Sequence, residues 1–452
     1  MNSKNIFKHS QTISSSAIPD PQEAFVWIWL PDETTPVVAG RLESMDNTSI
    51  QFNYGQSYLT RKNKIALYDK ELPLVKGRIP LRNGLSIPGV IRDAAPDAWG
   101  RRVIINKKFG QKSFSMDTIE LSEMIYLLES GSDRIGALDF QSSPQQYTAR
   151  ETGHSTLASL VTATELVEKG IPLPVDLALA LYHGSAIGGA RPKALIEDQC
   201  KKIKFIAKFS SSDDTYNVIK SEFIAMKLAK LCNINTAEVH QVKALHKDVL
   251  LIERFDRKFT KKGWVRKGLI SALSLLALDE NFARYASYQD LIEIIRKEFT
   301  KPQQTIRELY ARLVFNILVG NTDDHARNHA AFWDGKFLTL TPAYDICPQP
   351  RTGGIANQAM LIMDNNKKSQ ILSCLNASSI FMLSETEAIE IIENQMYTIL
   401  KKWNEVCEQA EISKIDKKLL MNTSFFNPYI IEDLPEKLGY LRKIVMDFKN
   451  PT

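Results

Sequence analysis

The chain has 452 residues, of which 44% are hydrophobic and 24% are charged, a balance typical of folded globular proteins. This composition excludes a mainly disordered, collagen-like or low-complexity chain, and the apolar runs are too short for a membrane span of ~20 residues. A net charge of +5 permits an anionic ligand but does not by itself predict nucleic-acid binding.

The N-terminus is rich in serine and lacks the apolar core of a secretory signal, so we expect residues 1–21 to form a flexible leader. The five cysteines are scattered and odd in number, with no C-x-x-C pair. This pattern argues against a disulfide framework or structural zinc site and predicts a reducing, cytoplasmic environment.

Residues 22–120 are expected to form a small β-rich subdomain. Three short β-type runs separated by turn residues open it, at 24–30, 36–42 and 49–54. Residues 91–105 are predicted to form one helix with Trp99 on its apolar side. The segment 122–140 then indicates a helix, a turn and a strand.

Residues 121–258 are predicted to mix strands and helices. Apolar spacing indicates helices at 155–169 and 218–232, while strict alternation indicates a strand at 203–209. Lys208 would point away from the apolar face of that strand. A glycine-rich loop precedes the strand, within the sequence HGSAIGGARPKAL.

The segment 257–267 holds six cations and no acid, and we expect it to connect two lobes. A solvated basic loop is the simpler interpretation, and contact with a nucleic acid or substrate is the alternative.

Residues 259–452 are predicted to be mainly helical. Apolar residues from Ile306 to Leu318 follow helical spacing, and Gly320 is typical of a residue that ends a helix. The pair Asp334-Gly335, between AAFW and KFLTL, is a strong signal for a β-hairpin.

Three polar residues around this hairpin suggest phosphoryl transfer. Asp323 is followed five residues later by Asn328, and Asp345 follows the hairpin. Protein kinases use this spacing, with one carboxylate to orient the attacking hydroxyl and an Asn and Asp to hold Mg²⁺. The alternative is that Asp323 and Asn328 only cap loop turns.

Residues earlier in the chain fit the same chemistry in kinase order. Lys208 could reach nucleotide phosphates, with Gly188 and Gly189 in a loop above them and Glu222 as the partner of the lysine. Taken singly, Lys208 could be an edge-strand lysine and the glycines an ordinary turn. Patterns for P-loops, dinucleotide-binding loops and nucleophile elbows are absent, and His325-Ala-Arg-Asn-His329 lacks the Glu of a zincin.

Seven motifs stand out along the chain: IRDAAPDAWGRR, SDRIGALDF, SAIGGARPKA, FIAKFS, LLIERFDR, LVGNTDDHARNHA and TPAYDI. Together they resemble the HipA-type serine/threonine kinases, the toxins of bacterial toxin–antitoxin systems, and the resemblance spans about residues 22–430. It implies an α+β, bilobal protein-kinase-like fold with a small β-rich N-terminal subdomain. The N-lobe would be mixed and the C-lobe mainly helical.

The resemblance also implies roles for individual residues. Asp323 would be the catalytic base, Asn328 and Asp345 would bind Mg²⁺, and Ser185 would be autophosphorylated to switch the kinase off. The ATP contacts would come from Ala186, Ile187, Gly188, Gly189, Lys208, Glu253, Arg254, Phe255, His325 and Tyr344.

A HipA-type kinase would use ATP and Mg²⁺ to phosphorylate a protein, with an aminoacyl-tRNA synthetase as the expected target, and would arrest growth. Its expected partner is a helix-turn-helix antitoxin, through which it would meet DNA only indirectly. The sequence departs from the family pattern at GGARPK, Asp324 and Arg327, which leaves substrate choice open. A kinase-like scaffold acting as co-repressor and a small-molecule phosphotransferase are the alternatives.

Overall fold

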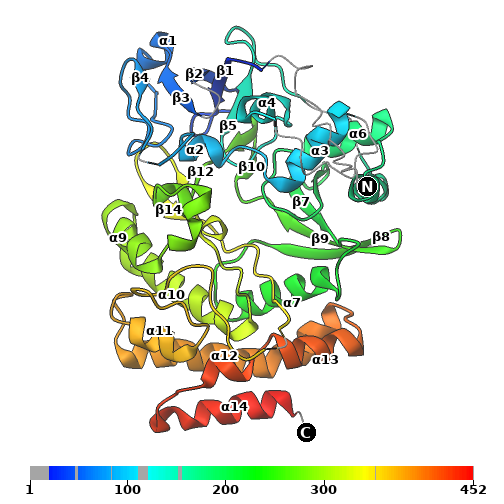
Figure 1. The fold of residues 1–452 in the computed structure, drawn as a ribbon, viewed down its shortest axis with the longest axis vertical. Coiled ribbons are helices and arrows are strands. Elements are labelled where there is room, and N and C mark those ends of the chain that lie inside the picture. Colours follow the sequence, from blue (N-terminus) through cyan, green and yellow to red (C-terminus); the bar gives the residue numbers. More distant parts are fainter. Residues whose placement is uncertain are drawn as a thin grey trace, which may run out of the picture.

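The computed structural model describes six stretches of the chain, residues 20–45, 49–82, 84–109, 121–150, 155–351 and 353–450. In Figure 1 the chain passes from a β-rich unit at the top, through a four-stranded sheet, to a block of helices at the bottom. The leader predicted over residues 1–21 lies outside the described residues, apart from Asp20 and Pro21.

The β-rich unit is a five-stranded antiparallel sheet with the order β4-β3-β2-β1-β5. The three β-type runs predicted from the sequence correspond to β1, β2 and β3, and β3 buries every second residue. The last strand, β5, pairs with β1, so the unit extends to Gln141. The boundary that the sequence predicted at residue 120 would separate β5 from the other strands. The strands are β1 (Glu23–Ile28), β2 (Val37–Ser44), β3 (Ile50–Tyr54), β4 (Arg78–Ile79) and β5 (Leu138–Gln141).

The helix predicted over residues 91–105 is wrong in one respect, because the structure divides it into two. Pro96 lies at the break, since proline lacks an N–H donor and disfavours helical geometry in the residue before it. Trp99 is buried, as expected. The helices of this part are α1 (Gln56–Leu59), α2 (Gly89–Arg92), α3 (Ala98–Phe109) and α4 (Glu123–Glu129).

The second sheet has the order β6-β7-β9-β8, and helices pack on both of its faces. Ala207 and Phe209 of β7 share a core with α5, whereas Lys208 lies on the opposite face, where α7 packs. The strand predicted over residues 203–209 matches β7 residue for residue. These elements are α5 (Leu157–Glu168), α6 (Val175–His183), β6 (Lys193–Asp198), β7 (Ile203–Phe209), α7 (Val218–Leu231), β8 (Val239–Ala244) and β9 (Lys247–Glu253).

The basic segment after β9 forms a hairpin of β10 (Arg257–Thr260) and β11 (Gly263–Arg266). Four of its six cations are exposed, in keeping with a solvated segment: Lys258, Lys261, Lys262 and Lys267. Arg257 is buried at its base and pairs with Asp133 and Asp256. The hairpin predicted at Asp334-Gly335 is present. It joins β13 (Ala330–Trp333) to β14 (Leu338–Leu340), and β13 also pairs with β12 (Gly268–Ser271).

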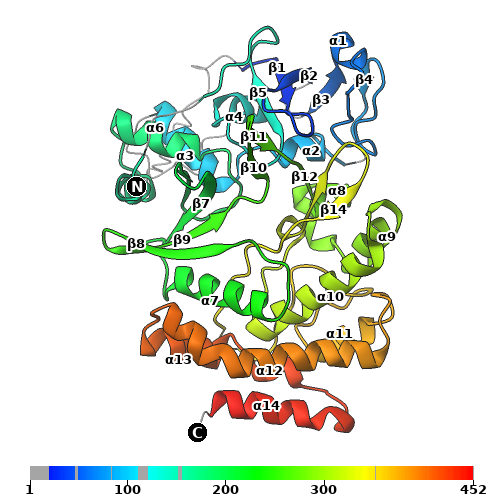
Figure 2. The same ribbon diagram turned by 180° about the vertical axis from the view of Figure 1, so that it is seen from behind.

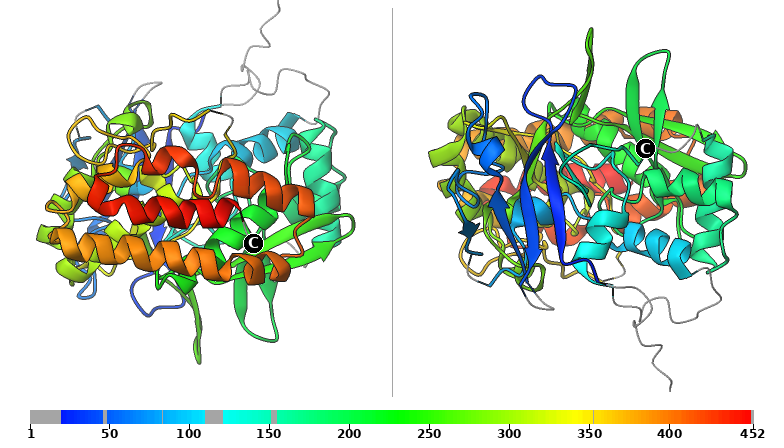
Figure 3. Two further views of the ribbon diagram at one scale, coloured as in Figure 1. Left: turned by 90° about the horizontal axis from the view of Figure 1, so that it is seen from below. Right: turned by 90° about the horizontal axis from the view of Figure 1, so that it is seen from above.

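The lower part of the molecule is helical, as predicted, and Figures 2 and 3 show α12 and α14 side by side at its base. The central helix α10 ends at Gly320, which has φ +72° and lies close to the backbone of Ser424. The helices are α8 (Ala272–Leu275), η2 (Glu280–Tyr285), α9 (Tyr288–Glu298), α10 (Pro302–Val319), η3 (Ala326–Asn328), α11 (Ile371–Ala377), α12 (Glu385–Gln409), α13 (Lys414–Thr423), η4 (Pro428–Ile431), η5 (Glu436–Leu438) and α14 (Gly439–Lys449).

All five cysteines are free thiols, and three of them are buried. Within the described ranges, no helix is both long and apolar enough to cross a lipid bilayer.

Candidate active site

The loop between α10 and β13 carries the candidate catalytic carboxylate. Asp323 is exposed, whereas its neighbour Asp324 is buried and binds His329 at 2.9 Å and the hydroxyl of Tyr288. Asp324 therefore anchors the loop from inside and leaves Asp323 facing solvent. Partial burial raises the pKa of Asp323. The nearby charge of Asp345 also raises it, whereas His325 lowers it, and the net shift is upward. A raised carboxylate pKa suits a group that accepts a proton.

Asn328 lies in the same loop as Asp323, and Asp345 follows β14. The amide nitrogen of Asn328 donates to the carbonyl oxygen of Asp323 at 3.0 Å, so the amide oxygen is the atom left to face a cation. Asp345 has φ +60°, a conformation that costs energy for a residue other than glycine and that concentrates at functional sites. An amide oxygen and a carboxylate are ligands that suit Mg²⁺.

Lys208 joins the two lobes through its ammonium group. It donates to Glu222 of α7 at 2.7 Å and also to Asp345. Burial alone would lower the pKa of Lys208, but the two carboxylates outweigh burial and raise it, so the lysine stays charged. The pairing of Lys208 with Glu222, expected from the sequence, is therefore present in the structure.

A second buried lysine lies beside the first and was missed by the sequence analysis. Lys193 of β6 is opposite Lys208 of β7 in the sheet register, and its ammonium donates to the carbonyl oxygen of Gly188 at 2.5 Å. Burial, followed by the charge of Lys208, lowers the pKa of Lys193 to about 8. The signal in the sequence was a lysine at the start of the strand that follows the glycine-rich loop.

The glycine-rich loop continues from the end of α6 and folds back over these lysines. Ser185 is fully buried, and its hydroxyl donates to the carbonyl oxygen of Tyr182 at 2.7 Å. The same hydroxyl accepts the backbone N–H of Gly131 at 3.1 Å. Ala186 and Ile187 are also buried, so Gly188 and Gly189 are the part of the loop that is more open.

The residues predicted to meet adenine have divided roles. The side chain of Arg254 is fully buried and binds Asp133 and Asp256, and Glu253 binds His240 at 2.9 Å. These two side chains therefore point away from the space between the lobes. Phe255, by contrast, has its ring 5.6 Å from that of Tyr344, so these two form one aromatic wall at the hinge.

His325, which the sequence predicted to lie close to the phosphates, follows Asp323 by two residues. Its Nδ1 atom is buried and has no hydrogen-bond partner in the described structure. The ammonium groups of Lys208 and Lys193 lie near Asp345, and Asp345 lies near Asp323 in the loop that also carries Asn328. Together these groups fit a nucleotide with Mg²⁺. In the described part of the chain, no cluster of three or more His, Cys, Asp or Glu could hold a metal alone. Mg²⁺ sites completed by substrate phosphates do not need such a cluster.

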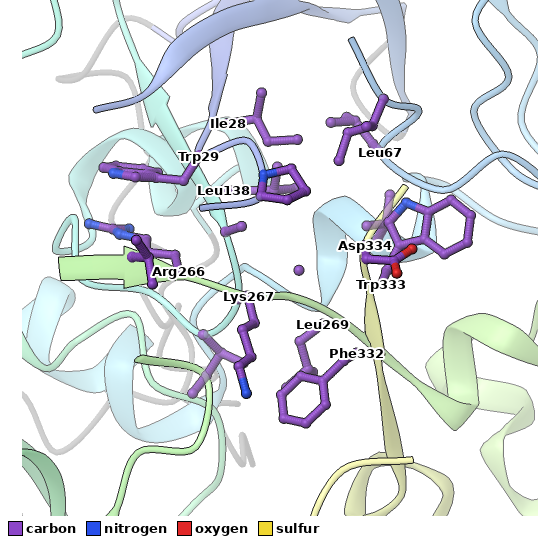
Figure 4. A pocket seen from close by; sticks show the side chains of 18 of the residues that line it. Ile28, Trp29, Leu67, Leu138, Arg266, Lys267, Leu269, Phe332, Trp333 and Asp334 are labelled. Carbon is purple, nitrogen blue, oxygen red and sulfur yellow. The ribbon is translucent and has the colours of Figure 1, made fainter. Parts of the chain in front are cut away.

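A separate cavity of about 410 Å³ lies between the β-rich unit and the rest of the chain (Figure 4). Its lining is mainly apolar and includes Trp29, Leu67, Leu138 and Phe332 (Figure 4). None of the candidate site residues lines it. Phe332 of its lining lies near the hinge, with its ring 5.8 Å from that of Phe255.

Comparisons with known proteins agree with this architecture. A solved structure of HipA from Shewanella oneidensis, in complex with HipB and operator DNA, matches with a TM-score of 0.60. The match covers 94% of this chain and 95% of that one, at 18% sequence identity, and so concerns the fold. The two lobes, with the β-rich unit beside them, thus form a bilobal kinase-like fold.

The family follows from the sequence. Family models of the HipA N-terminal domain and the HipA-like C-terminal domain match residues 28–141 and 185–403. The chain belongs to the HipA-like family.

Two curated relatives match shorter stretches. The serine/threonine-protein kinase toxin HipA of Shewanella oneidensis is 23% identical over 211 residues, 41% of this chain and 48% of that protein. A putative kinase, Y4mE, of Sinorhizobium fredii is 26% identical over 136 residues, 28% of this chain and 31% of the relative. The chain thus aligns with about half or less of the length of these relatives.

Proposed function

We propose that this protein is an ATP- and Mg²⁺-dependent serine/threonine protein kinase that acts as a growth-arresting toxin. One observation carries the proposal: Lys208 contacts both Glu222 and Asp345, beside a loop that presents Asp323 and Asn328. This arrangement joins a phosphate-binding lysine to a metal-binding carboxylate and a free catalytic carboxylate, as phosphoryl transfer requires.

Each side chain has a defined task in this reaction. Bound ATP supplies the phosphoryl group, and Mg²⁺ offsets the charge of its phosphates. Asp323 orients the hydroxyl of the substrate and accepts its proton, which its raised pKa favours. Lys208 and Lys193 hold phosphate oxygens, and Asn328 and Asp345 hold the metal. Phe255 and Tyr344 offer an aromatic wall to adenine.

Autophosphorylation of Ser185 would switch the enzyme off. The hydroxyl is buried and both of its hydrogen bonds are made inside the fold, so the loop must leave this position before Ser185 can react. A phosphoserine adds about 1.5–2 negative charges and could not return beside the Tyr182 carbonyl oxygen without a large desolvation cost. The modified loop would then remain away from the nucleotide.

The relative solved with HipB and operator DNA suggests the setting in which the protein acts. We propose a helix-turn-helix antitoxin as the partner, which would bring the pair to DNA. The proposed target is a translation component, with an aminoacyl-tRNA synthetase as the first candidate. We propose a cytoplasmic location, because the cytoplasm supplies ATP and its reducing conditions keep thiols free.

Growth arrest in cells tests this function. Induced expression of the wild-type chain should stop growth, and Asp323→Asn should remove the effect while leaving ATP binding unchanged. Glu280→Gln, an exposed carboxylate outside the proposed machinery, serves as the control and should remain toxic. Equal toxicity of the wild type and Asp323→Asn would contradict a catalytic toxin and favour a role in binding alone.

A further inference from the structure

Asp97 lies immediately before α3 and contacts both loops of the candidate active site. One carboxylate oxygen accepts the backbone N–H of Gly189 in the glycine-rich loop at 2.6 Å. The other oxygen accepts from the guanidinium of Arg327, in the catalytic loop, at 2.6 Å. A single side chain from the N-terminal part of the chain therefore joins two segments that lie 92 and 230 residues away.

Neighbours of Asp97 hold the same loop. The backbone N–H of Trp99 donates to the carbonyl oxygen of Gly189 at 3.3 Å, and its indole N–H donates to that of Lys193 at 2.9 Å. Gly100 packs so closely on the loop that a Cβ atom there would lie 1.9 Å from the Ser185 carbonyl oxygen. Asp97, Trp99 and Gly100, at the start of α3, thus form a surface that packs closely against the glycine-rich loop.

Arg327 connects this surface at the start of α3 to the proposed catalytic residues. It stands between Asp323 and Asn328 in the chain, and its carbonyl oxygen accepts the Tyr344 hydroxyl at 2.7 Å. Its guanidinium also binds Glu280, on the side away from the glycine-rich loop. Movement of Asp97 would therefore affect both the loop above the phosphates and the loop that carries the catalytic carboxylate.

We propose that Asp97 is a positioning residue that holds the glycine-rich loop closed over the nucleotide and in register with the catalytic loop. The inference rests on the proposed kinase function and deepens it, because it gives the N-terminal unit a direct part in nucleotide binding. Hydrogen bonds to an ionised group are short and about twice as strong as neutral ones, and Asp97 makes two of them. Release of the loop, which must precede any reaction of Ser185, requires the hydrogen bond from the Gly189 N–H to Asp97 to break.

The test compares Asp97→Asn with the wild-type full-length chain. Asparagine keeps the shape and one acceptor but removes the charge that pairs with Arg327. We expect the Kd for ATP to rise about 5- to 20-fold, in line with the loss of charge-assisted hydrogen bonds. Hydrogen exchange at residues 185–190 should become faster, while exchange in α3 stays the same. Asp97→Ala, which removes both contacts, should show a larger effect in both measurements.

The control is Glu280→Gln, which removes the other partner of Arg327 without touching the loop and should leave ATP affinity and loop exchange near the wild-type values. Unchanged ATP affinity and loop exchange in Asp97→Asn would overturn the proposal. Tighter ATP binding would also overturn it, since Asp97 would then compete with the phosphates for the Gly189 N–H. Binding and exchange are read without turnover, so a failure of kinase activity is distinguishable from a failure of this proposal.

Discussion

At the scale of single residues, burial and charge decide which side chains can act. Asp323 and Asp324 are neighbours in the sequence, yet one is exposed and the other is buried against His329 and Tyr288. The kinase-type spacing predicts roles for Asp323, Asn328 and Asp345 from the sequence alone, because that pattern is local. The sequence analysis missed Lys193 because its position beside Lys208 depends on the pairing of β6 with β7, which only the fold reveals.

The lowered pKa of Lys193 predicts that ATP binding depends on pH. Below pH 8 the ammonium is charged and attracts phosphate, and as the pH rises through about 8 the lysine loses its proton. The Kd for ATP should therefore rise several-fold between pH 7 and pH 9. Lys193→Met should bind ATP more weakly at pH 7 and show a flatter profile. Nucleotide titrations at a series of pH values check this, and an unchanged profile in the variant would count against the role of Lys193.

At the scale of helices and strands, local patterns predicted well and distant partners did not. The strand at 203–209, the hairpin at Asp334-Gly335 and the end of α10 follow from alternation, turn residues and a C-cap glycine. The buried ion pair of Arg257, in the basic segment 257–267, was not predicted because its partner Asp133 lies 124 residues earlier. The segment 91–105 was predicted as one helix instead of two because the break at Pro96 was overlooked.

The glycine that ends α10 gives a prediction about stability. Gly320 has φ +72°, and a Cβ atom there would lie 2.7 Å from the carbonyl oxygen of Ser424. Gly320→Ala should therefore lower the free energy of unfolding by about 1–3 kcal/mol. Gly354→Ala is the matched control, since nothing lies within 4 Å of its Cβ position, and a change within about 0.5 kcal/mol is expected. Chemical denaturation compares the two, and equal stabilities would refute the argument.

At the scale of the whole molecule, the β-rich unit packs against the rest of the chain and is hydrogen-bonded to it. The indole of Trp333 donates to the carbonyl oxygen of Ala66 at 2.9 Å, and Gly335 packs on Ile65. Asp97 and the start of α3 add contacts at the glycine-rich loop. The sequence predicted a β-rich unit, but its boundary and its contact with the active site depend on pairings between distant segments.

The most direct measurement is phosphoryl transfer by purified protein. Wild-type protein and Asp323→Asn would be incubated with Mg²⁺ and labelled ATP, and any modified residue would be mapped by mass spectrometry. The account predicts label on Ser185 in the wild type and a loss of at least about 100-fold in Asp323→Asn, the usual effect of removing a general base. Equal labelling of the two proteins, or no transfer by wild-type protein that binds ATP, would contradict it.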